Sequence, residues 1–151
     1  LERKINGYQQ HYFAPIQHLQ KQLIDGYSGS DAAQHLLQLR AQIQEANHAG
    51  RVAECHYLDE NRCQAAIALV ALVFNAKADL YLSLLNGENV GQLLQELRDD
   101  YQLINFHGNH FSHAQLYESY LNLRLEELKF AALLQAAKAH SVQEQAEKLL
   151  N

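Results

Sequence analysis

The sequence predicts an all-α protein with five to six helices, and three observations lead to this prediction. The composition is dominated by good helix formers, among them Leu, Ala, Gln, Glu and Lys. Helix breakers are few, with one Pro and seven Gly in 151 residues. Apolar residues recur every three or four positions along most of the chain, which is the period of an amphipathic helix. We therefore expect a single helical domain over residues 1–151, in which antiparallel αα-hairpins surround a buried central helix.

The first predicted helical segment covers residues 1–25. Its apolar stripe consists of Ile5, Tyr8, Tyr12, Ile16, Leu19 and Leu23. Pro15 interrupts the stripe, because a proline inside a helix removes a hydrogen bond and clashes with the preceding turn. Two interpretations stay open: one helix that is kinked at Pro15, or a short segment that ends near Phe13 and is followed by a second helix.

The next predicted helix follows a turn at residues 27–31 and ends near Asn47. Ser28 and Asp31 have the spacing of a capping box, which favours a helix start at this point. The helical period is carried by Ala33, Leu36, Leu37, Arg40 and Ile43. The Gly at position 50 then provides a stop signal.

The central helix is predicted over about residues 52–85. Residues 65–74 form an unbroken apolar run, so a helix there has no polar face and must be covered by neighbours or by lipid. Lipid is disfavoured, because a bilayer needs about 20 apolar residues and this run is about half as long. The many Ala residues argue against a strand. The Asn-Gly pair at residues 86–87 ends the helix.

Two further helices are predicted after the central one, at about residues 89–104 and 112–140. The segment between them, NFHGNH at residues 105–110, has the composition of a loop. Ser112 with Gln115 resembles a capping box that starts the second of these helices. Ser141 with Glu144 indicates either a last short helix or a bent continuation.

A weak internal repeat occurs at an offset of 58 residues. The matching pairs are Leu36 and Leu94, Leu39 and Leu97, Arg40 and Arg98, Gln44 and Gln102, Asn47 and Asn105, Gly50 and Gly108, Leu58 and Leu116, and Glu60 and Glu118. Each copy reads as a shorter helix, a turn and a longer helix, which predicts two stacked αα-hairpins. Chance similarity between Leu-rich helices is the other interpretation.

The charge distribution and the N-terminal sequence indicate which partners and which location to expect. The net charge is -5, and the twelve basic residues are scattered, so no basic face suits a nucleic-acid backbone. No signal peptide or lipidation motif is present, which favours the cytoplasm and no direct membrane insertion of this segment. The chain contains no Met and opens on Leu1. We interpret it as a segment of a larger bacterial-type protein.

The two cysteines, Cys55 and Cys63, are expected to be free. If both lay on the central helix, they would be separated by about 12 Å along its axis. A disulfide requires Cα atoms within about 7 Å of each other. The sequence therefore predicts buried structural thiols in a reducing compartment.

Three histidines, His107, His110 and His113, are the candidate metal ligands. Imidazoles that are grouped on a loop can bind Zn, Ni or Cu. This pattern suggests a sensor that binds a small ligand or a metal ion, with zinc as the cofactor. The alternative is a polar surface loop without a ligand.

Catalytic motifs are missing from the sequence. No nucleophile elbow, phosphate-binding loop or Gly-rich dinucleotide loop is present. The carboxylate neighbours Asp99-Asp100 and Glu126-Glu127 are expected to lie on solvated helix faces. The sequence favours a protein without enzymatic activity, although a pocket assembled from distant residues stays open.

Aromatic residues mark the candidate partner-binding surface, because Tyr is enriched at protein interfaces. The candidates are Tyr8, Tyr12, Phe13, Tyr117 and Tyr120. Each can also belong to the edge of a helical core. The leading hypothesis is a non-enzymatic interaction or regulatory module that binds a protein partner or associates with itself.

Overall fold

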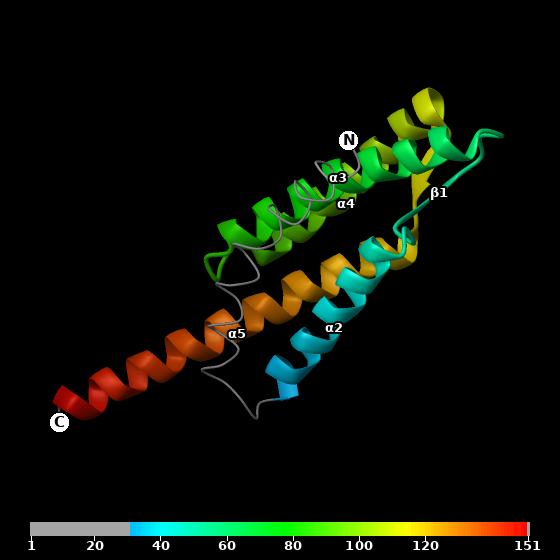
Figure 1. Cartoon of the computed structure of the whole chain (residues 1–151). Coiled ribbons are helices and arrows are strands. Elements are labelled where there is room, and N and C mark those ends of the chain that lie inside the picture. Colours follow the sequence, from blue (N-terminus) through cyan, green and yellow to red (C-terminus); the bar gives the residue numbers. More distant parts are fainter. Residues whose placement is uncertain (1–30, 151) are drawn as a thin grey trace.

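The computed structural model describes residues 31–150, which form four helices and one pair of short strands (Figure 1). The mostly helical fold predicted from the sequence is confirmed, but the pair of strands was not expected. The predicted helical segment over residues 1–25, with Tyr8, Tyr12 and Phe13, lies outside the described residues. In chain order the elements are α2 (Asp31–His48), β1 (Ala53–Cys55), α3 (Glu60–Leu84), α4 (Val90–Ser112), β2 (Ala114–Leu116) and α5 (Glu118–Leu150).

The strands form an antiparallel ribbon in which Ala53 pairs with Leu116 and Cys55 with Ala114. The sequence had placed the first strand in the central helix and the second strand in the last long helix. Strands of three residues are too short to show an alternating pattern, so these positions were assigned to the helices that flank them. Gly50 separates α2 from the first strand, and its φ of 69° is a conformation that glycine adopts without strain.

Helix α3 is shorter than the predicted central helix because it begins at Glu60. The Asp59 side chain caps its N-terminus by accepting hydrogen bonds from the backbone N–H groups of Asn61 and Arg62. Its C-terminal end agrees with the prediction. The expectation that the apolar run 65–74 is buried on all sides is wrong among the described residues, because Leu69 is 50% exposed and Val73 is 43% exposed.

By length and composition, α3 is the one helix within residues 31–150 that could cross a membrane, and half of its apolar window is buried in the fold. The core helix of a soluble protein passes the same test. The absence of membrane insertion therefore stays a prediction.

The predicted loop at residues 105–110 is helical and belongs to α4. This helix ends instead at Ser112, whose hydroxyl donates to the carbonyl of Gly108 over 3.1 Å, and His113 then adopts a left-handed conformation. The predicted capping role of Ser112 for the following helix is therefore wrong. Helix α5 runs without interruption to Leu150, so no separate last helix forms.

The helices pack as two pairs, α3 against α4 and α2 against α5, with the strand ribbon at one end (Figure 1). The order helix–strand–helix therefore occurs twice along the chain. Among the helices within residues 31–150, the consecutive pair α3 and α4 packs extensively, and α4 and α5 pack on each other less extensively. In each half the shorter helix packs chiefly on the longer helix of the other half. The C-terminal part of α5, residues 136–150, extends past the other helices and is exposed.

Candidate functional site

Seven polar residues meet in the core between α2, α3 and α5, and we call them the polar cluster. They are Arg40, Asn47, Asn75, Asp79, Tyr120, Arg124 and Glu127. Cluster residues from the same helix lie on one face of that helix because they are separated by three, four or seven positions. The cluster consists of an uncharged layer and a charged layer.

In the uncharged layer, Asn47, Asn75 and Tyr120 form a closed ring of hydrogen bonds. The Asn47 amide donates to the Tyr120 hydroxyl over 2.8 Å, and the Tyr120 hydroxyl donates to the Asn75 side-chain oxygen. The Asn75 amide closes the ring by donating to the Asn47 side-chain oxygen over 2.7 Å. Mutual pairing of this kind removes the cost of burying amides and a hydroxyl.

In the charged layer, two arginines and two carboxylates alternate. Arg124 contacts Asp79 on α3 and also lies 3.2 Å from a carboxylate oxygen of Glu127. Arg40 on α2 lies 3.4 Å from the other carboxylate oxygen of Glu127. All four side chains are buried, and Arg124 is only 1% exposed. The layer has no net formal charge.

Burial raises the pKa of some groups in this cluster and lowers the pKa of others. Desolvation raises the pKa of the Asp79 carboxyl above its usual range, although the neighbouring Arg124 opposes the shift. Desolvation lowers the pKa of Arg40. For Arg124, desolvation is outweighed by Glu127, Tyr120 and Asp79, so its pKa is raised and the guanidinium stays charged. Burial also raises the pKa of Tyr120.

The polar cluster joins three helices and is suited to specifying how they pack. Buried ion pairs of this kind contribute little net stability, but removing one partner leaves an uncompensated charge. A catalytic group must reach a substrate, and the four charged residues are at most 7% exposed. We therefore assign the cluster a structural role.

Sequence reasoning missed most of the polar cluster. The expectation that Glu127 lies on a solvated face is wrong, because this residue is 4% exposed. A signal was present: Asn75 and Asp79 lie four residues apart within an otherwise apolar helix, and Tyr120 and Arg124 have the same spacing in α5. Arg40 had been placed on the apolar face of α2 by its period, and it is indeed buried.

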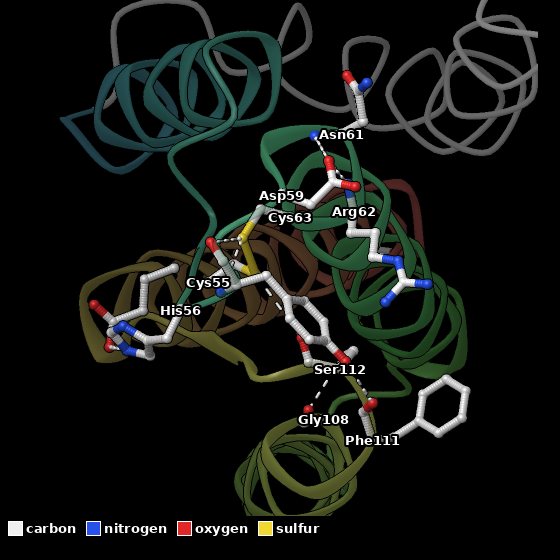
Figure 2. The surroundings of a disulfide bond; sticks show 11 residues. Cys55, His56, Asp59, Asn61, Arg62, Cys63, Gly108, Phe111 and Ser112 are labelled. Atoms are coloured by element: carbon white, nitrogen blue, oxygen red, sulfur yellow. Dashed lines mark hydrogen bonds and ion pairs between the residues drawn. A yellow bond between two sulfur atoms is a disulfide. The ribbon is translucent and has the colours of Figure 1, made fainter.

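A groove of about 430 Å³ opens where the strand ribbon meets the start of α3 and the end of α4. We call it the corner groove. Its lining residues are Tyr57, Arg62, Ala65, Ala66, Leu69, Phe111 and Ser112. Figure 2 shows Arg62 and Phe111 projecting on the same side of this corner, next to the disulfide.

Cys55 and Cys63 form a disulfide beside the corner groove (Figure 2). The prediction that they cannot bridge is wrong. It assumed that both lie on one helix, whereas Cys55 ends β1 and Cys63 lies in the first turn of α3. The intervening residues reverse the chain direction and bring the two Cα atoms to 5.4 Å.

The predicted metal ligands lie at the end of α4, each in its own environment. The His110 ring nitrogen Nδ1 lies 2.8 Å from the carbonyl oxygen of Phe106, and the His107 ring packs edge-on against Phe106. The His113 ring packs edge-on against Tyr57. Within residues 31–150, no three His, Cys, Asp or Glu side chains are grouped so that they could hold a metal ion. Zinc binding stays a prediction.

Of the two predicted partner-binding tyrosines that are described, only one reaches the surface. Tyr117 is 38% exposed, whereas Tyr120 is 1% exposed and belongs to the polar cluster. Tyr120 therefore offers no surface to a partner in this fold. Its spacing alone could not separate a core tyrosine from an interface tyrosine.

A family model described as "SNIPE associated domain" matches residues 29–139. The chain belongs to this family. The SNIPE associated domain thus includes α2, both strands, α3, α4 and most of α5, together with the whole polar cluster and corner groove. No curated protein and no solved structure shows a significant match to the chain.

Proposed function

We propose that this SNIPE associated domain is a non-enzymatic interaction module of a larger bacterial-type protein, and that its interaction is dimerisation. One observation carries this proposal. The outward side of α3 presents Leu69, Val73, Leu80 and Leu84, which are 43–50% exposed. We call these four residues the α3 face. Soluble chains rarely leave a contiguous apolar surface of this kind without a partner.

A second copy of the same helix fits the α3 face. The four residues are spaced four, seven and four positions apart, which is the spacing of a seam that packs against another helix. A two-fold axis would place identical leucines against each other. Lys77 lies at the edge of this face, where its ammonium is 3.9 Å from the carboxylate of Asp100. This assignment also agrees with the absence of catalytic motifs in the sequence.

Light scattering of the full chain tests the dimer. We expect twice the 17.2 kDa mass of the chain, and we expect Leu80→Gln to produce a monomer with unchanged helicity. Leu149→Gln is the matched control, because Leu149 is 88% exposed but lies outside the α3 face. This control variant should remain dimeric.

Two outcomes contradict the proposal. The first is a wild-type monomer at the highest soluble concentration. The second is a Leu80→Gln variant that loses helicity, which would show that the face is covered within one chain. Adding zinc to the same samples tests the alternative function, a sensor that acts through His107, His110 and His113. A rise in melting temperature that His110→Ala removes would support that alternative.

A further inference from the structure

We propose that the corner groove binds a segment of a partner protein in which an apolar side chain lies next to a carboxylate. This binding site goes beyond dimerisation, and it shares one residue, Leu69, with the α3 face. The argument has three steps: the apolar lining, the cation at its edge, and the bonds that hold the two in place.

The apolar lining is large enough for a bulky side chain. Ala65, Ala66 and Leu69 form one wall on α3, and Phe111 stands opposite at the end of α4. The volume of about 430 Å³ is within the range of ligand-binding clefts. Phe111 is 80% exposed, so most of its ring is not covered by the described residues. Exposed aromatic residues of this kind are enriched at protein interfaces.

Arg62 is the one charged residue among those that line the corner groove. Its guanidinium makes no ion pair with any other residue in the described range. The two nearest acidic residues in sequence are Glu60 and Asp59: Glu60 is exposed, and Asp59 accepts backbone N–H groups at the cap of α3. A carboxylate from a partner therefore complements this groove better than a neutral or basic group.

One disulfide and two hydrogen bonds fix the walls of the groove in the absence of a ligand. The Cys55–Cys63 disulfide ties β1 to α3, and the Tyr57 backbone N–H donates to the sulfur of Cys63 over 3.2 Å. The Tyr57 hydroxyl donates to the carbonyl of Phe111 over 3.3 Å, which joins this loop to α4. A pre-formed site loses less conformational entropy on binding, so even a short segment can be recognised.

The test is a nuclear magnetic resonance titration of the full, oxidised chain with three synthetic peptides. The peptides share a central Leu-Phe pair and differ only in its flanking residues, which are Glu, Gln or Lys. We expect the Glu peptide to shift the amide signals of Arg62, Leu69 and Phe111. It should bind about threefold more tightly than the Gln peptide, because an exposed ion pair contributes a free energy of about this size. The Lys peptide should bind most weakly.

Three variants assign the effect to the groove. Arg62→Gln should abolish the preference among the peptides, and Phe111→Ala should weaken all three. Arg98→Gln is the matched control, because this exposed arginine on α4 does not line the groove. It should leave the three affinities unchanged.

Equal affinities for the three peptides, or no shift of the groove amides with any of them, would overturn the proposal. Binding to phosphatidylglycerol vesicles that requires Arg62 and Phe111, without peptide binding, would also overturn it in favour of a membrane surface. The oligomeric state is measured separately, so failure of this site and failure of the dimer are distinguishable.

Discussion

Arg124 is the most deeply buried charge in the molecule's described part, and its environment determines what a single substitution costs there. Moving a guanidinium out of water is unfavourable by several kcal/mol unless partners compensate, as an order-of-magnitude estimate. Asp79 and Glu127 are those partners, and they come from different helices. The contacts therefore link the ionisation of one residue to the packing of α3 on α5.

Replacing one carboxylate tests this linkage. Asp79→Asn keeps the size of the side chain but removes its charge, so Arg124 loses one of its two ionic partners. We expect the free energy of unfolding in urea to fall by about 3 kcal/mol, the lower end of the range for breaking a buried pair. That is a large part of the roughly 5–15 kcal/mol that stabilises a typical domain.

Asp99→Asn is the control for this substitution, because Asp99 is an exposed residue on α4. It should change the free energy of unfolding by less than about 0.5 kcal/mol. A loss below about 1 kcal/mol in Asp79→Asn would contradict the account, because it would mean that water or rearrangement replaces the missing charge.

Residue-level prediction from the sequence succeeded for apolar positions and failed for polar ones. Ala33, Leu36 and Ile43 were placed on the buried face of their helix by period, and they are buried. Glu127 carries the same local pattern as a solvated glutamate. Its burial depends on Arg40, which is distant in sequence and reaches it from another helix.

At the scale of elements, Gly108 explains why part of helix α4 was predicted to be a loop. A glycine among Asn and His residues is typical of a turn. In the structure this glycine lies inside α4, where a Cβ atom would come within 2.5 Å of the carbonyl oxygen of Ala114 and 3.3 Å of Val70. The glycine therefore allows α4 to approach β2 and α3 closely, which no local pattern reveals.

Gly108→Ala should destabilise the fold although Ala is the better helix former. The steric conflict with a backbone carbonyl requires α4 or β2 to move, at a cost typical of overpacking, about 1–3 kcal/mol. This cost exceeds the gain in helix propensity of about 1 kcal/mol. We therefore expect a lower melting temperature by calorimetry.

Gly91→Ala provides the matched comparison within the same helix, because nothing lies within 4 Å of the position that its Cβ would occupy. It should leave stability unchanged or raise it by up to about 1 kcal/mol. If Gly108→Ala behaves in the same way, the close approach of α4 to the strand ribbon is not needed for the fold.

Helices in which the apolar period is sustained over many residues were predictable, and strands that depend on pairing with a distant segment were not. Helix α2 was expected to end near Asn47 and ends at His48. The end of α3 was also found, because Gly87 provides a local stop signal. The strands could not be predicted from local sequence, because each of their three residues pairs with a residue about sixty positions away.

For the whole molecule, the two helix–strand–helix halves are interlocked rather than stacked side by side. Helix α2 packs on α5 and α4 packs on α3, so each half completes its packing on the other half. The internal repeat predicted from the sequence agrees with the alternation of a shorter and a longer helix. Its second turn, Asn105 to Gly108, lies inside α4, and α2 and α3 do not pack as the predicted αα-hairpin. The repeat could not reveal the exchange of packing partners, because both arrangements bury the same apolar stripes.

The corner groove was beyond sequence reasoning for the same reason. Its lining comes from the segment after β1, the start of α3 and the end of α4, and Tyr57 and Phe111 are separated by 54 residues. The ribbon of β1 and β2 and the packing of α3 on α4 bring these segments together. Of the candidate residues selected from the sequence, His113 packs against the groove residue Tyr57 but does not itself line the groove.

The disulfide changes the expectation about redox environment. Disulfides persist in oxidising compartments and are rare in the cytosol. The cytoplasmic location predicted from the sequence assumed that Cys55 and Cys63 are free thiols. Location therefore stays a prediction, and the oxidation state of this pair becomes a property of the whole fold that can be measured.

Reducing the disulfide should lower stability and loosen the corner groove without unfolding the helices. The bond closes a loop from Cys55 to Cys63, and the chain-entropy estimate for a loop of this length is about 2–3 kcal/mol. We expect dithiothreitol to lower the free energy of unfolding by about this amount and to speed hydrogen exchange at the Tyr57 amide, which donates to the Cys63 sulfur.

The double variant Cys55→Ala/Cys63→Ala should match the reduced protein and show no response to dithiothreitol. If dithiothreitol leaves wild-type stability and Tyr57 exchange unchanged, the cross-link does not hold β1 to α3, and the groove must derive its shape from the ribbon and Tyr57 alone.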